Sequence, residues 1–113
     1  MHELSLAEAL VEQLGEVARR EGAIRITAID LVLGEMSGVE REPFEFSFPI
    51  VAAGTVAEGA ILRFEEVPTA VYCKSCKRES SPEYPMIICA LCSSTDVEVI
   101  RGKDFSVKSM EVE

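Results

Sequence analysis

The sequence predicts an α+β fold in which two helices cover a small, mostly antiparallel β-sheet and a four-cysteine module is inserted. Two segments, 5–21 and 40–53, carry apolar residues at helical spacing. Three segments rich in β-branched and apolar residues predict strands: 23–34, 60–67 and 105–112. All four cysteines of the 113-residue chain fall in two Cys-x2-Cys pairs, which predicts a zinc-ribbon-like module.

The first helix is expected over residues 5–21. Ser5 and Glu8 have the spacing of a capping box, and Gly22 is a natural C-terminal stop. We therefore expect residues 1–4 to project from a rigid helix. Its apolar stripe consists of Leu6, Leu10, Leu14, Val17 and Ala18.

The segment 23–34 is predicted to be a strand. Its apolar residues alternate with other residues, but the alternation shifts by one position part of the way along. Ile24 and Ile26 set one phase, and Ile29, Leu31 and Leu33 set the opposite one. A bulge, or burial of both faces of the strand, would reconcile the two phases.

The second helix is expected over residues 40–53. Pro43 suits its first turn, Gly54 ends it, and Pro49 lies inside it, where a kink is expected. Phe44 and Phe48 fall on one face with Val51.

The predicted division places residues 1–68 and 104–113 in an α/β domain and residues 69–103 in the inserted module. About thirty residues bury too little apolar surface to be stable alone, so a metal replaces a core there. Residues 86–88 and 97–100 are the strand candidates of the module, and the strand 105–112 is expected to return to the sheet of the α/β domain.

The two cysteine pairs predict a closed tetrahedral metal site. Cys73 and Cys76 form the first pair, and Cys89 and Cys92 form the second. Four thiolates are typical of structural Zn2+ and leave no position open for catalysis. Two disulfides are the less favoured alternative, because no secretory signal is seen. A four-cysteine iron site has the same ligands and spacing.

Composition and charge exclude several functional classes. The chain has 11 basic and 20 acidic residues, a formal net charge of −9, which argues against nucleic acid as the main partner. No apolar run approaches the roughly 18 residues of a membrane span. We expect a cytoplasmic protein that is not an enzyme, because no histidine stands near a candidate nucleophile.

The N-terminus is a candidate for a second metal site. His2 is the only histidine, and on chemistry alone it is most simply a solvated residue near a chain end. However, the Met1 amine and the His2 imidazole are neighbouring nitrogen donors, and the amides of His2 and Glu3 can complete a plane. Square-planar nitrogen coordination is typical of Ni(II) or Cu(II).

Several segments together resemble the HypA family of nickel metallochaperones for [NiFe]-hydrogenase maturation. The opening Met-His-Glu-Leu-Ser-Leu, the Leu-Gly-Glu-Met-Ser-Gly-Val loop and the two cysteine pairs match the family pattern. Ala-Gly-Thr at 53–55, Glu-Gly-Ala at 58–60 and Met-Glu-Val at 110–112 match as well. The resemblance covers essentially the whole chain.

The resemblance implies a nickel metallochaperone with a separate structural zinc site. His2 would be the essential nickel ligand, helped by the Met1 amine and the backbone nitrogens of His2 and Glu3, and the four cysteines would hold Zn2+. The implied partners are the GTPase HypB, the hydrogenase large subunit and urease maturation proteins, and the chain would be a monomer or weak homodimer. Some members carry histidines beside the zinc cysteines, and this chain has none. The alternative function is a zinc-ribbon interaction module without transferable metal.

Overall fold

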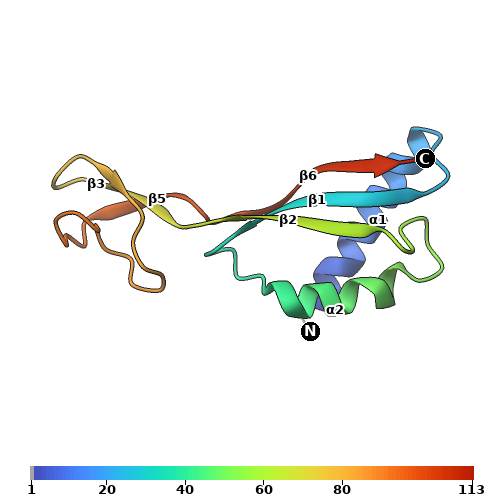
Figure 1. Ribbon diagram of the computed structural model, residues 1–113, viewed down its shortest axis with the longest axis horizontal. Coiled ribbons are helices and arrows are strands. Elements are labelled where there is room, and N and C mark those ends of the chain that lie inside the picture. The colour runs from blue at the N-terminus through green and yellow to red at the C-terminus, as the bar shows by residue number, and fades with distance from the viewer. Residues whose placement is uncertain (1) are drawn as a thin grey trace. The chain divides into compact units, whose positions relative to one another are not determined.

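The computed structural model describes residues 2–113, and Met1 lies outside the described residues (Figure 1). The chain forms two compact units, of which the first holds Met1–Leu31, Val39–Phe64 and Val107–Glu113. The second holds Val32–Gly38 and Glu65–Ser106. The elements are α1 (His2–Arg20), β1 (Ile26–Gly34), α2 (Arg41–Ala52), β2 (Ile61–Val67), β3 (Ala70–Cys73), β4 (Glu79–Ser80), β5 (Val97–Arg101) and β6 (Phe105–Val112).

Helix α1 begins earlier than the sequence predicts. It starts at His2, so residues 2–4 are helical, and the expectation that they project from the helix is wrong. Ser5 lies inside the helix and is not its N-cap. The first turn also makes a tertiary contact that local sequence does not show: the main-chain N–H of Glu40 donates to Glu3 Oε2 at 3.3 Å. An acidic residue in the first turn also interacts favourably with the helix dipole.

Strand β1 is the centre of a three-stranded sheet with the order β2-β1-β6. Its buried positions change phase as the sequence predicts, from Ile26 and Ala28 to Ile29 and Leu31. Ile24 was expected to belong to this strand, but it precedes β1 and is 82% exposed.

The directions of the strands follow from hydrogen bonds at both ends of β1. The N–H of Ile24 donates to Glu113 O, and that of Gly34 donates to Asp104 O, so β6 runs antiparallel to β1. The strand 105–112 therefore returns to the first sheet, as predicted. Strand β2 follows α2 as a crossover and runs in the same direction as β1 (Figure 1).

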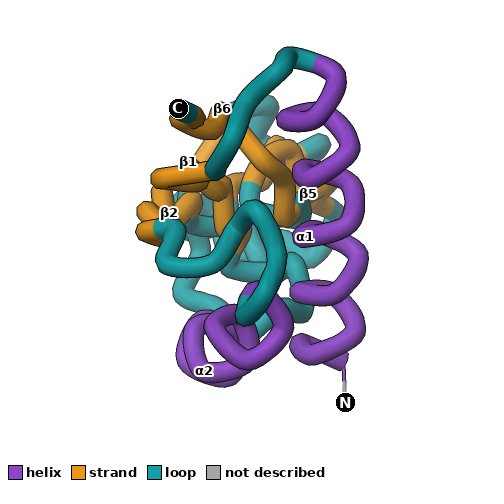
Figure 2. Tube along the Cα trace, turned by 90° about the vertical axis from the view of Figure 1, so that its right-hand side faces the viewer, coloured by secondary structure: helices purple, strands orange, loops and turns teal. Residues whose placement is uncertain are grey.

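Helix α2 packs beside the N-terminal end of α1 (Figure 2). Phe44 and Phe48 are buried on its inner face, and the ring of Phe44 meets that of Phe64 edge to face at 6.3 Å. The predicted range of 40–53 is correct to within one residue at each end. Gly54 follows with a φ of 79°, a conformation that glycine adopts without strain.

The second unit contains the sheet β4-β3-β5, in which both strand pairs are antiparallel. The predicted strand at 86–88 is wrong: the N–H of Met86 donates to Glu83 O and that of Ile88 to Met86 O, so this backbone is satisfied by turns. The predicted strand at 97–100 is present as β5. Strands β3 and β4 were not predicted.

The loop Val32–Gly38 belongs to the second unit because it is hydrogen bonded to both chain segments that flank the module. The N–H of Glu35 donates to Val67 O, and the N–H of Met36 donates to Gly102 O. The carboxylate of Glu35 in turn accepts the N–H of Thr69 at 2.9 Å. The division at residues 69 and 103 remains a prediction. Among the helices of residues 2–113, neither is long and apolar enough to span a bilayer.

Candidate metal centres

The four cysteines converge on one point in the second unit. All four Sγ atoms lie within 4.8 Å of one another, and all four thiols are free. Cys73 and Cys92 have their sulfurs 3.6 Å apart, and Cys76 and Cys89 have theirs 3.7 Å apart. A tetrahedron with Zn–S bonds of about 2.3 Å has S–S edges of about 3.8 Å. The donor set therefore fits a tetrahedral thiolate site for zinc, and it fits iron equally well.

The two cysteine pairs lie in turns of the same geometry. The N–H of Cys73 donates to Arg78 O at 3.0 Å, and the N–H of Lys77 donates back to Cys73 O at 2.8 Å. In the second turn the N–H of Cys89 donates to Ser94 O and that of Ser93 to Cys89 O, both at 2.9 Å. Each turn therefore presents its two sulfurs in the same way.

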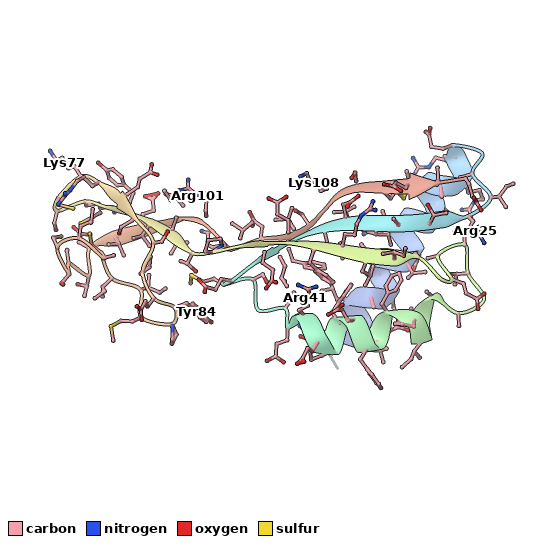
Figure 3. All side chains as sticks on the ribbon, in the orientation of Figure 1. Arg25, Arg41, Lys77, Tyr84, Arg101 and Lys108 are labelled. Carbon is pink, nitrogen blue, oxygen red and sulfur yellow. The ribbon has the colours of Figure 1, made fainter. Side chains whose placement is uncertain are left out.

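The residue after each pair has a left-handed backbone conformation. Lys77 has a φ of 60° and Ser93 a φ of 66°. Glycine is the residue that usually adopts this conformation. Because neither position is a glycine, the sequence gives no signal of it. Figure 3 shows Lys77 on the cysteine-bearing part of the second unit, with its side chain directed outward.

Main-chain N–H groups point at the sulfurs and favour the thiolate form, which is the form that binds metal. The N–H of Cys92 donates to Cys89 Sγ at 3.4 Å and that of Leu91 does so at 3.3 Å. These bonds, the Cys92 N–H first, lower the pKa of Cys89 to about 6. The N–H of Cys76, 3.4 Å from Cys73 Sγ, lowers the pKa of Cys73 in the same way.

Three serine hydroxyls support the cysteine turns, and the sequence alone did not reveal them. Ser80 Oγ lies 3.8 Å from Cys89 Sγ and accepts the N–H of Ala90 at 3.1 Å. Ser75 and Ser94 join the two turns through their hydroxyls at 2.9 Å. Such outer contacts orient metal ligands. Their only sequence signal is the position of each serine near a cysteine.

The predicted N-terminal site lies at the start of α1, in the first unit. Met1 lies outside the described residues. The side chain of His2 is 68% exposed, and its Nδ1 lies 3.6 Å from Glu3 Oε2. The Glu3 carboxylate is largely buried, and the Glu40 N–H, with help from His2, holds its pKa below the usual range. An accessible imidazole thus stands beside a fixed negative charge.

Comparison with known proteins identifies the family. The family model described as "Hydrogenase/urease nickel incorporation, metallochaperone, hypA" matches residues 1–112. Hydrogenase maturation factor HypA of Chlorobium limicola is 39% identical over 113 residues, which are 100% of this chain and 97% of that protein. The corresponding factor of a Roseiflexus species is 39% identical over 114 residues, covering 100% of this chain and 93% of its own.

Solved structures show the same fold. A solution structure of a HypA protein covers 100% of this chain and 97% of its own with a TM-score of 0.74 and 25% identity. The solution structure of the Ni metallochaperone HypA from Helicobacter pylori covers 97% of this chain and 96% of its own with a TM-score of 0.68 and 24% identity. The full-length matches show that the chain belongs to the HypA family of hydrogenase and urease nickel-incorporation metallochaperones.

Proposed function

We propose that the chain binds Ni(II) at its N-terminus and delivers it for maturation of [NiFe]-hydrogenase. The donors are the Met1 amine, the His2 imidazole and the backbone nitrogens of His2 and Glu3. The observation that carries the proposal is the position of the only histidine, exposed in the first turn of α1. Because its side chain is 68% exposed, the imidazole is accessible to a metal ion.

The helical start of α1 supports chelation by consecutive backbone nitrogens. The torsion that relates the amide nitrogens of His2 and Glu3 is ψ of His2, which is about −42° in an α-helix and about +135° in a strand. A five-membered chelate ring needs a small torsion, so a helical His2 holds the two nitrogens on the same side. The first N–H groups of a helix also lack carbonyl partners within it. Both features support the proposal that these two amides lose their protons and bind the metal.

We propose that the four-cysteine cluster holds zinc as a structural ion, separate from the nickel. Cys73, Cys76, Cys89 and Cys92 would supply all four ligands of a closed tetrahedron, which leaves no position for cargo. The N-terminal nitrogens, in contrast, suit the planar geometry that Ni(II) prefers. The two metals therefore occupy different donor sets.

The family and the chemistry together suggest the partners. We propose that the GTPase HypB and the hydrogenase large subunit take part in the transfer, with urease maturation proteins as further recipients. The protein would work in the cytoplasm, where its thiols stay reduced and available to zinc. It would act as a monomer or a weak homodimer.

The experiment is a nickel titration of the zinc-loaded protein with its native N-terminus beside a His2→Ala variant. Uptake of about one Ni(II) by the native protein, strongly weakened in the variant, supports the proposal. X-ray absorption at the nickel edge should show nitrogen and oxygen neighbours. Sulfur in the first shell of nickel in a zinc-replete sample would contradict the separate sites.

The alternative is a zinc-ribbon interaction module that carries no transferable metal. The exposed side chains Tyr84, Met86 and Leu91 of the second unit favour an interaction role for that unit. Metal analysis separates the two functions, since a pure interaction module retains one zinc and takes up no nickel.

A further inference from the structure

Helix α2 carries large apolar side chains on its solvent side as well as on its buried face. Its inner face packs Phe44, Ser47 and Phe48 into the core. On the opposite side, Phe46 is 74% exposed and Ile50 is 61% exposed. Two large apolar side chains that neighbour each other on the solvent side of a helix form an exposed patch of the kind that marks an interaction site. Phe46, Ile50 and the exposed Pro49 between them form what we call the α2 outer face.

These side chains are one turn apart and form one continuous stripe. Residues at i and i+4 lie side by side on a helix, so Phe46 and Ile50 are neighbours. An open hollow of about 690 Å³ continues the stripe towards the start of α2, lined by Glu40, Arg41, Glu42, Pro43 and Phe46. Aromatic residues, phenylalanine among them, are enriched at the cores of protein interfaces.

The charges around this stripe are mainly acidic. Glu42 and Glu45 are exposed on the same helix. The nearby cation, Arg41, is paired with Glu45 at 3.2 Å, and its guanidinium carbon lies 4.6 Å above the ring centre of Phe64. Figure 3 shows Arg41 on the side of α2 that faces the sheet. Arg41 offsets the charge of Glu45, but the exposed carboxylates of Glu40 and Glu42 at the same hollow keep the rim negative.

We infer that the α2 outer face docks a protein segment that carries an apolar anchor together with lysine or arginine residues. The anchor would cover Phe46 and Ile50, and the cations would face Glu42 and Glu45. A second copy of this chain is disfavoured, because a symmetric contact would place the same glutamates opposite each other in a protein of charge −9. An anionic membrane is repelled by the same rim.

The place of this surface makes docking useful for metal transfer. The bond from the Glu40 N–H to Glu3 Oε2 joins the start of α2 to the first turn of α1. A bound segment that continued past the start of α2 would therefore reach the first turn of α1, which carries His2. The inference goes beyond the proposed function and does not depend on which atoms hold nickel.

The test uses two short amphipathic helical peptides, one of leucine and lysine and one of leucine and glutamate. Each is titrated into the full, zinc-loaded chain without nickel, and binding is followed residue by residue by NMR. We expect the lysine peptide to shift signals of residues 40–53, and Phe46→Ser with Ile50→Ser to weaken its binding at least about tenfold. Glu42→Gln with Glu45→Gln should weaken it and reduce its salt dependence.

The matched control is Ile24→Ser, because Ile24 is 82% exposed and lies outside α2. It should leave the peptide affinity unchanged. Equal binding of the glutamate peptide, or shifts centred outside residues 40–53, would overturn the inference. So would concentration-dependent shifts on α2 without peptide, which indicate self-association, or binding to phosphatidylglycerol vesicles that depends on Phe46. Nickel uptake of the Phe46→Ser protein, measured separately, should match that of the unchanged chain.

Discussion

The carboxylate of Glu3 accepts the main-chain N–H of Glu40 at 3.3 Å and thereby joins the first turn of α1 to the residue that precedes α2. Glu40 is the N-cap of α2, and its own side chain makes no cap hydrogen bond. A side chain from one helix thus satisfies a backbone donor at the start of the other.

Removing this acceptor should loosen the start of α2. We expect Glu3→Ala to speed hydrogen exchange of the Glu40 amide, because a part-buried N–H loses its partner. Glu3→Gln keeps an acceptor oxygen and should retain most of the protection. Glu8→Ala, an exposed change on the same helix, is the control. Unchanged exchange at Glu40 in Glu3→Ala would show that the bond is not formed in solution.

Zinc removal should unfold the inserted module and spare the helices. A small segment that gathers four ligands depends on its metal for stability, whereas the first unit has its own core. We expect a strong chelator to abolish amide protection across residues 69–103 and to leave it around Phe44 and Ile29. Hydrogen exchange with and without the chelator measures this. Uniform loss of protection over the whole chain would contradict the predicted division.

The exposed side of the first sheet should give an acid-sensitive contribution to stability. Arg63 donates to both carboxylate oxygens of Asp30, from Nε at 2.8 Å and from Nη2 at 3.2 Å. These bonds, with a further one from Ser109, hold the pKa of Asp30 below its ordinary value of 3.8. A lowered pKa means that the stabilisation is present above the unfolded pKa and is lost as pH falls through the folded one.

We therefore expect Asp30→Asn to lower the urea midpoint at neutral pH and to flatten its decline below about pH 4. The effect should be small, because Arg63 is half exposed and surface pairs contribute little. Glu98→Gln, a change at an exposed carboxylate on β5, is the control. Identical pH profiles for Asp30→Asn and the unchanged protein would contradict the prediction.

Ser93→Gly should stabilise the metal module. Ser93 is exposed and has a φ of 66°, and a left-handed conformation costs a residue with a side chain roughly 1–2 kcal/mol. Glycine removes this cost but loses more entropy on folding, so a net gain of about 0.5–1 kcal/mol is expected. Resistance of the zinc-loaded module to chelator and urea measures it. Ser93→Ala keeps the backbone strain and should not stabilise the module. If Ser93→Ala stabilised the module as much as Ser93→Gly, the explanation would be contradicted.

The sequence predicts those features whose cause is local. The spacing of the cysteine pairs predicts the cluster of four sulfurs, and the apolar spacing around Phe44 predicts α2 to within one residue at each end. The shift in the apolar pattern near Ile29 correctly predicts which residues of β1 are buried. The same pattern wrongly includes Ile24, which precedes the strand and is exposed.

The features that were missed depend on contacts distant in sequence. The first turn of α1 is hydrogen bonded to Glu40, which lies 37 residues beyond Glu3. Strands β3 and β4 are four and two residues long, and the burial of β3 has no alternating pattern. The loop around Glu35 joins the second unit through bonds to segments more than thirty residues away, and no local pattern encodes such bonds.

An extension ahead of Met1 should weaken nickel binding sharply and leave the fold and the zinc intact. It converts the terminal amine into an amide, which is a much poorer donor unless it too loses its proton. The cysteine cluster is in the other unit and does not involve this end of the chain. Calorimetric nickel titration of native, extended and His2→Ala proteins measures the effect, with zinc content and circular dichroism as controls for the fold.

The same titrations at several pH values test the donors further. Amines and imidazoles must lose a proton before they bind metal, so protons compete with Ni(II) and the affinity of the native protein should fall as the solution becomes mildly acidic. This decline offers a release mechanism that needs no histidine near the zinc, where the chain has none. The extended protein should bind weakly across the whole pH range. If it instead binds nickel as tightly as the native chain with the same pH profile, the N-terminal site is wrong and the interaction-module alternative gains support.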